Sequence, residues 1–308
     1  MAMTPPAHAA SSGRSRLFGA TPLEHGQRAV LLLLVVLTVA AWALTIAQAR
    51  TMSMPMGVTV PDTGMALETG GEAGGASGAM GGMATDGAGA MAAAGWSLGG
   101  GVAFVVAWAV MMVAMMFPAA APMLLLFRRV TSQRPAAGGG VVSTGVFAAG
   151  YVLVWTAVGI LTWVLVRLGS ELAGRLGSAE RDTWAPIALG AVLVLAGLYQ
   201  LTPLKRVCLD HCRSPLGFLM THWREGQLGA LRMGLVHGVY CLGCCWALFA
   251  VLVGAGVMSL AWMLLLTLVV FAEKVLPGGR RAAQAVGVAF LALGVLVASG
   301  ALRMPWVA

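Results

Sequence analysis

Seven long apolar segments constrain the fold of this chain more than any other feature of its sequence. They run roughly over residues 29–49, 102–127, 141–168, 184–201, 233–257, 260–275 and 282–302. A helix needs about 20 mainly apolar residues to cross a bilayer. Charged residues make up 10% of the chain, whereas soluble domains contain about 25%. We therefore predict an all-α protein, a polytopic transmembrane helix bundle of about seven spans.

The basic residues predict how this bundle is oriented. Lys and Arg gather in the cytoplasmic loops of membrane proteins. When successive segments alternate between the two sides, 14 Lys and Arg fall on the side of the N-terminus and five on the other. The N-terminus is therefore predicted to be cytoplasmic and the C-terminus external. This asymmetry accounts for the net charge of +8, so we expect a lipid bilayer and no nucleic acid as partner.

Composition divides the chain into four parts. Residues 1–28 are predicted to form a cytoplasmic tail, and residues 29–49 the first transmembrane helix. The end of this helix, Ala47-Gln48-Ala49, fits a small-x-small cleavage signal, but the apolar stretch is long for a signal peptide, which favours an uncleaved signal anchor. Residues 50–101 are rich in Gly, Ala and Met, which predicts a flexible external linker. Residues 102–302 are left as a six-helix membrane domain.

The fifth apolar segment carries the strongest candidate metal ligands, His237, Cys241, Cys244 and Cys245. In a helix the first three lie on one face, and Cys245 lies beside them. Thiolates combined with imidazole suit Cu(I) or Zn(II). The alternative is that these cysteines are inert, because a free cysteine often packs as a small apolar residue.

A second candidate group, Cys208, His211 and Cys212, follows the fourth apolar segment. This spacing is compatible with a metal clip or a dithiol, and permanent disulfides are rare in the cytoplasm. The alternative is a basic loop, residues 203–232, that lies on anionic lipid. Basic residues at the start of this loop include Lys205, Arg206 and Arg213.

Methionines in the second apolar segment form a third candidate group: Met111, Met112, Met115 and Met116. Thioether sulfur favours Cu(I), although methionine also fills gaps in packed helices. Pro118 removes a backbone donor, so a carbonyl one turn earlier must find another partner inside the membrane.

Two further features are less specific. The linker contains methionines that could collect Cu(I) outside the cell, namely Met52, Met54, Met56, Met65, Met80, Met83 and Met91. Glu273 and Lys274 end the sixth apolar segment, and we expect both to reach the membrane interface. The alternative is that Glu273 faces the bundle as a ligand or proton carrier.

Together these motifs resemble an uncharacterised bacterial family of predicted metal-binding integral membrane proteins with a domain of unknown function. The matching pieces are MMVAMMFP at 111–118, YQLTPLKRVCLDHC at 199–212, SPLGF at 214–218, GLVHGVYCLGCCW at 234–246 and EK at 273–274. The resemblance implies a membrane location and metal binding, and it implies no reaction. A bacterial origin would place the chain in the cytoplasmic (inner) membrane.

The leading functional prediction is a membrane protein that handles or transports a soft metal ion, with Cu(I) favoured over Zn(II). It would work with metal-delivery or assembly partner proteins, and no residue is assigned a catalytic role. One alternative is a thiol-redox protein, the only enzymatic class kept open. The other is a non-catalytic assembly or structural subunit whose cysteines are simply packed.

Overall fold

The computed structural model describes residues 25–51, 96–133, 140–176, 178–255 and 259–302. The linker methionines and most of the predicted cytoplasmic tail lie outside these ranges. The described part of the chain contains helices and no strand, which confirms the all-α bundle. The helices are α1 (His25–Thr51), α3 (Leu98–Ser132), α4 (Gly140–Gly174), α5 (Ser178–Leu201), α6 (Pro203–Arg213), α7 (Pro215–His222), α8 (Gly226–Ala255), α9 (Leu260–Val275) and α10 (Gly279–Ala298).

Six of these helices are long and apolar enough to cross a membrane, namely α1, α3, α4, α5, α8 and α10. The predicted sixth span forms α9, whose 16 residues are fewer than the about 20 of a full span. Its end is dictated by Pro277, because a proline disfavours helical backbone at the residue before it. Leu276 is accordingly extended. Among the described residues the structure thus has six long apolar helices and one shorter one, where the sequence predicts about seven spans.

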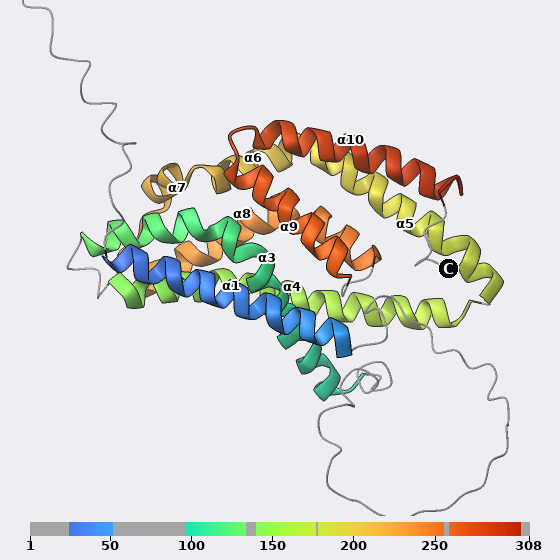
Figure 1. The fold of residues 1–308 in the computed structure, drawn as a ribbon, viewed down its shortest axis with the longest axis horizontal. Helices are drawn as coiled ribbons and strands as arrows, with labels where there is room; N and C mark the ends of the chain where they lie inside the picture. Colours follow the sequence, from blue (N-terminus) through green and yellow to red (C-terminus); the bar gives the residue numbers. More distant parts are fainter. Residues whose placement is uncertain (1–24, 52–95, 134–139, 177, 256–258, 303–308) are drawn as a thin grey trace, which may run out of the picture.

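The segment 203–232, predicted to be a loop, instead forms α6, α7 and the start of α8. Thr202 caps α6, since its side chain accepts a hydrogen bond from the Lys205 backbone N–H at 3.3 Å. Pro203 occupies the first helical position, where a missing N–H costs nothing. Figure 1 shows α6 and α7 at one end of the bundle, beside the start of α10.

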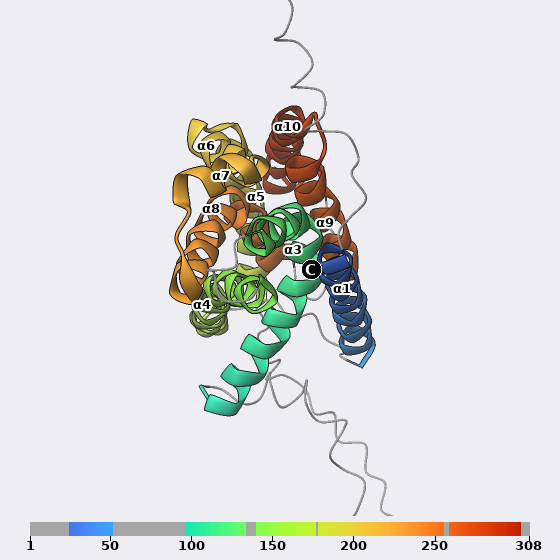
Figure 2. The same ribbon diagram turned by 90° about the vertical axis from the view of Figure 1, so that its left-hand side faces the viewer.

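Helix α1 packs along α3, on the outside of the bundle (Figure 2). The Trp42 indole Nε1 donates to the Ala114 carbonyl at 3.1 Å. This is the carbonyl whose usual helical donor is missing at Pro118. The carbonyl that Pro118 leaves without a helical donor is therefore satisfied by a side chain of α1.

Helices α4 and α8 are joined by a close backbone contact. A Cβ built on Gly234 of α8 would lie 2.1 Å from the Phe147 carbonyl oxygen, and one on Gly150 of α4 would lie 2.5 Å from the Leu231 carbonyl oxygen. Only glycine permits this approach, which resembles the small-residue packing of membrane helices. The contact fixes the register of α4 against the helix that carries the cysteines.

Candidate metal centre

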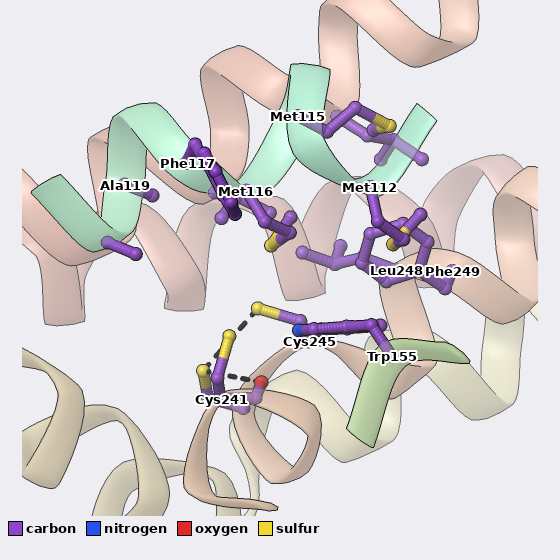
Figure 3. Close-up of a cluster of buried hydrophobic side chains, with 14 of the residues drawn as sticks. Met112, Met115, Met116, Phe117, Ala119, Trp155, Cys241, Cys245, Leu248 and Phe249 are labelled. Carbon is purple, nitrogen blue, oxygen red and sulfur yellow. Dashed lines mark hydrogen bonds between the residues drawn. The ribbon is translucent and has the colours of Figure 1, made fainter. Parts of the chain in front are cut away.

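Four cysteines from two helices meet inside the bundle, and we refer to them as the thiol group: Cys212 of α6 and Cys241, Cys244 and Cys245 of α8. Cys244 Sγ lies 3.4 Å from Cys245 Sγ and 3.8 Å from Cys212 Sγ. The Cys244 thiol also donates to the Cys241 carbonyl oxygen at 3.1 Å. Figure 3 shows Cys241 and Cys245 close together on α8. The structure therefore unites the fifth-segment cysteines with one cysteine of the predicted Cys208–Cys212 motif.

Helix α6 reaches the thiol group because α8 has a glycine at the crossing point. A Cβ built on Gly243 would lie 2.7 Å from Cys208 Sγ, so Cys208 packs directly over this glycine. Cys212 lies one turn further along α6 and reaches Cys244. Gly238 plays the same part toward α4, where a Cβ would lie 2.9 Å from Val154 Cγ2. Both glycines thus allow a neighbouring helix to approach α8 closely.

The Cys241 sulfur has two polar neighbours besides the thiols. Lys274 Nζ of α9 donates to it at 2.9 Å, and the Tyr151 hydroxyl of α4 lies 3.0 Å away. Lys274 and Tyr151 are both buried. An ammonium group beside a sulfur compensates negative charge on that sulfur. The expectation that Lys274 reaches the membrane interface is therefore wrong.

Glu273 also lies inside the bundle, and its carboxylate makes a buried ion pair with Lys205 of α6. Lys205 Nζ lies 2.7 Å from Glu273 Oε2, and both side chains are 1% exposed. Gln200 Nε2 donates to Glu273 Oε1 at 3.1 Å, and Lys205 Nζ donates to Gln200 Oε1. Lys205 therefore does not lie on lipid head groups as a basic loop would require. It fastens α6 to α9.

Two further contacts hold α6 in place. The Arg213 guanidinium donates to the Glu273 carbonyl oxygen at the end of α9. Arg280 of α10 pairs with Asp210 through contacts of 2.9 Å and 2.5 Å. The helix that delivers Cys212 is thus anchored by charged groups to α9 and α10.

A cavity of about 140 Å³ adjoins the thiol group. His237, predicted as a ligand beside the α8 cysteines, lines this cavity and is 4% exposed. Its ring packs against Phe147, Tyr151 and Phe218. Its Nδ1 atom is buried and has no hydrogen-bond partner among the described residues.

The remaining predicted ligands are not members of the thiol group. His211 stacks on Tyr240, with ring centroids 4.2 Å apart, and its Nδ1 contacts the Val207 carbonyl at 2.8 Å. The methionines Met111, Met112, Met115 and Met116 are all buried in α3. In Figure 3 Met116 points from α3 toward the side on which Cys245 lies, whereas Met115 points to the other side of the helix.

The surroundings of both α6 cysteines favour the neutral thiol. The neighbouring Cys241 side chain raises the pKa of Cys212. Burial raises the pKa of Cys208. Each of these thiols would have to lose its proton to bind a metal ion.

The donor types fit a soft ion better than a hard one. Thiolate, thioether and imidazole donors select Cu(I) or Zn(II), and four sulfurs bound at about 2.3 Å in a tetrahedron lie about 3.8 Å apart. Among the described residues, however, no three His, Cys, Asp or Glu side chains already surround one metal position. The sulfurs are gathered within reach of one another, and binding would require them to turn toward a common ion.

Sequence reasoning did not find the polar neighbours of the thiol group. Lys274 and Glu273 are adjacent charged residues at the end of an apolar segment, and such residues inside a membrane often mark a function. These two residues stand out in the sequence, but both were expected to reach the membrane interface. Tyr151 lies in an ordinary apolar segment, and nothing in its sequence context distinguishes it.

The family of the chain emerges from comparison with known proteins. A family model described as PpoB2, a copper chaperone, matches residues 105–297. This range is more than half of the 308 residues, and it contains the thiol group, Tyr151, His237 and Lys274. No curated protein and no solved structure matches the chain.

Proposed function

Because this chain belongs to the PpoB2 copper chaperone family, we propose that its membrane bundle binds Cu(I) as cargo through the thiol group. The ligands would be drawn from Cys212, Cys241, Cys244 and Cys245. Zn(II) is the less favoured ion, since a copper chaperone family and a Met-rich sequence both favour copper.

The observation that supports this proposal best is the position of Cys212. Its sulfur comes from a separate helix and lies 3.8 Å from Cys244 Sγ, although the two residues are 32 positions apart. Cysteines that merely fill space on α8 would not need a fourth thiol from α6. The convergence of two elements on one sulfur cluster is what a soft metal ion requires.

The positive charge on Lys274 also supports Cu(I) binding by the thiol group. Two thiolates around one Cu(I) carry one net negative charge, which is unfavourable in an apolar interior. The Lys274 ammonium, 2.9 Å from Cys241 Sγ, would offset that charge. The copper ion, the two thiolates and the ammonium would together be neutral, so they could stay buried without a further counter-ion.

We also propose how the cargo is handled. Copper would be collected on one side of the membrane by the methionines of the linker, and Met116 of α3 would lie on its way to the thiol group. Partner proteins would then receive or deliver the ion at the side of α6. The distribution of basic residues supports a cytoplasmic position for that side, and the membrane would be a bacterial inner membrane.

The test is an anaerobic Cu(I) titration of the purified protein in detergent against a chromophoric Cu(I) chelator. We expect at least one tightly bound Cu(I) per chain, with sulfur donors in its X-ray absorption spectrum. Replacement of Cys241 or Cys244 by Ser removes this tight binding. Cys208→Ser is the matched control, because Cys208 packs on Gly243 outside the thiol group, and this variant should bind as the unchanged protein does.

Two outcomes would contradict the proposal. If the folded protein binds no Cu(I), and oxidation instead links Cys212 to Cys244 in a disulfide, the thiol-redox alternative is favoured. If the Cys241 and Cys244 variants leave both Cu(I) binding and cellular copper handling unchanged, the cysteines are packing residues in a structural subunit.

A further inference from the structure

The cavity beside the thiol group is a second place where a soft ion could be held. It lies where α3, α6, α8 and α9 meet, and its volume is about 140 Å³. A cavity of about 150 Å³ is large enough to hold a small ligand. The lining side chains with polar or sulfur atoms are Met123, Cys212, Arg213, His237 and Lys274.

The buried imidazole of His237 is evidence that this cavity holds a ligand. Its side chain is more than nine-tenths buried, and its Nδ1 has no hydrogen-bond partner among the residues that the structure describes. A buried polar atom without a partner is unfavourable, and such an atom in a native fold requires a reason. A bound ion near the ring would supply that reason, because neutral imidazole is a common metal ligand.

We propose that the cavity is a second Cu(I) position, with Cys212, His237 and Met123 as its donors. This inference rests on the proposed function and extends it, since Cys212 also belongs to the thiol group. One side chain would thus be shared by the two positions. Copper could pass from the cavity to the buried thiols by ligand exchange at the Cys212 sulfur.

The cations around the cavity do not oppose this assignment. Lys274 is paired with the Cys241 sulfur at 2.9 Å, and Arg213 donates to carbonyl oxygens at the end of α9. When Cu(I) binds, it replaces the proton of the Cys212 thiol, and that proton leaves to solvent. One positive charge replaces another, so the charge of the cavity is unchanged and no added repulsion arises.

The geometry also explains why this position differs from the thiol group. Its donor set would combine one thiolate with a neutral imidazole and a neutral thioether. Fewer thiolates bind Cu(I) less tightly, and a weaker position beside a tighter one suits entry and release. Met123 is buried, so a thioether is available there without exposure to oxidants in bulk water.

The experiment is the same Cu(I) titration, extended to the second equivalent. We expect the unchanged protein to bind two Cu(I) per chain and to show a nitrogen donor in its X-ray absorption spectrum when both are bound. His237→Phe should lose the weaker equivalent and the nitrogen signal. Phenylalanine preserves the contacts of this ring with Phe147, Tyr151 and Phe218.

Two further variants make the result specific. Met123→Leu should weaken the second equivalent while the first is unchanged, which tests the cavity even if His237→Phe does not fold. His211→Phe is the matched control, because this histidine stacks on Tyr240 and does not line the cavity. It should keep both equivalents.

The outcomes separate this inference from the proposed function. One sulfur-only equivalent that both cavity variants leave intact overturns the second position alone. Loss of every equivalent in a folded His237→Phe protein also overturns it, because the two positions would then not be distinct. A protein that binds no Cu(I) overturns both proposals.

Discussion

Adjacent charged residues at the end of α9 serve two different partners. Glu273 pairs with Lys205 at 2.7 Å, whereas Lys274 donates to the Cys241 sulfur at 2.9 Å. The first contact is an ion pair between two helices, and its loss would leave a charge buried without a partner. The second contact is electrostatic support for a sulfur. Substitutions at these neighbouring positions should therefore have different consequences.

We expect Lys274→Leu to lower Cu(I) affinity by about 10–100-fold, the usual loss when a group that supports a metal ligand is removed. Leucine removes the charge and adds no donor atom for copper, and it suits a buried position, so the fold should be retained. Competition titration measures this change. An unaltered affinity would contradict the role of Lys274.

Glu273→Gln should act on stability. This change leaves the buried Lys205 ammonium without a carboxylate, and breaking a buried ion pair in this way costs about 3–5 kcal/mol. Unfolding of the purified protein in detergent, followed by circular dichroism, measures the loss. Stability equal to that of the unchanged protein would show that the Glu273–Lys205 pair is not structural.

Pairs of helices fix the geometry of the thiol group. The close contact of Gly150 and Gly234 sets α4 against α8, and this register brings the Tyr151 hydroxyl to Cys241 Sγ. Any widening of the contact would move Tyr151 away from the sulfur.

Gly234→Ala should therefore destabilise the protein and weaken Cu(I) binding together. The new methyl group would lie 2.1 Å from the Phe147 carbonyl oxygen, and overpacking of this kind costs about 1–3 kcal/mol. Gly145→Ala on α4 is the matched control, since a Cβ there meets nothing within 4 Å. Thermal unfolding compares the two, and similar melting temperatures would contradict the close contact.

Residues that share a face of one helix could be predicted from the sequence, whereas contacts between different helices could not. The stripe of Cys241 and Cys244 was predictable, because side chains three residues apart share a face of any helix. The partnership of Lys274 with Cys241 was not, because it depends on how α9 lies against α8. Likewise, Cys208 and Cys212 could not be separated by spacing alone. Gly243 decides which of them enters the thiol group.

Across the whole molecule, the orientation in the membrane depends on the short helix α9. At about 1.5 Å per residue its 16 residues extend about 24 Å, less than the about 30 Å of a hydrocarbon core. The distribution of basic residues nevertheless agrees with seven passes, with the two ends of the chain on opposite sides.

We therefore expect a periplasmic alkaline phosphatase reporter to be active when fused after Leu302, and a fluorescent protein to fold when fused before the N-terminus. Together these results would place the N-terminus in the cytoplasm and the C-terminus outside. Activity of only one of the two reporters would place both ends of the chain on the same side and would show that α9 does not cross the membrane.

The hydrogen bond between Trp42 and Ala114 has a consequence for the fate of α1. Were a peptidase to cleave after Ala49 and remove α1 as a leader, the Ala114 carbonyl would lose its indole donor, and Pro118 could not replace it. A buried oxygen left without a donor in this way costs about 1–3 kcal/mol. We therefore expect the bundle to be more stable with its first helix attached, whatever part that helix plays in export.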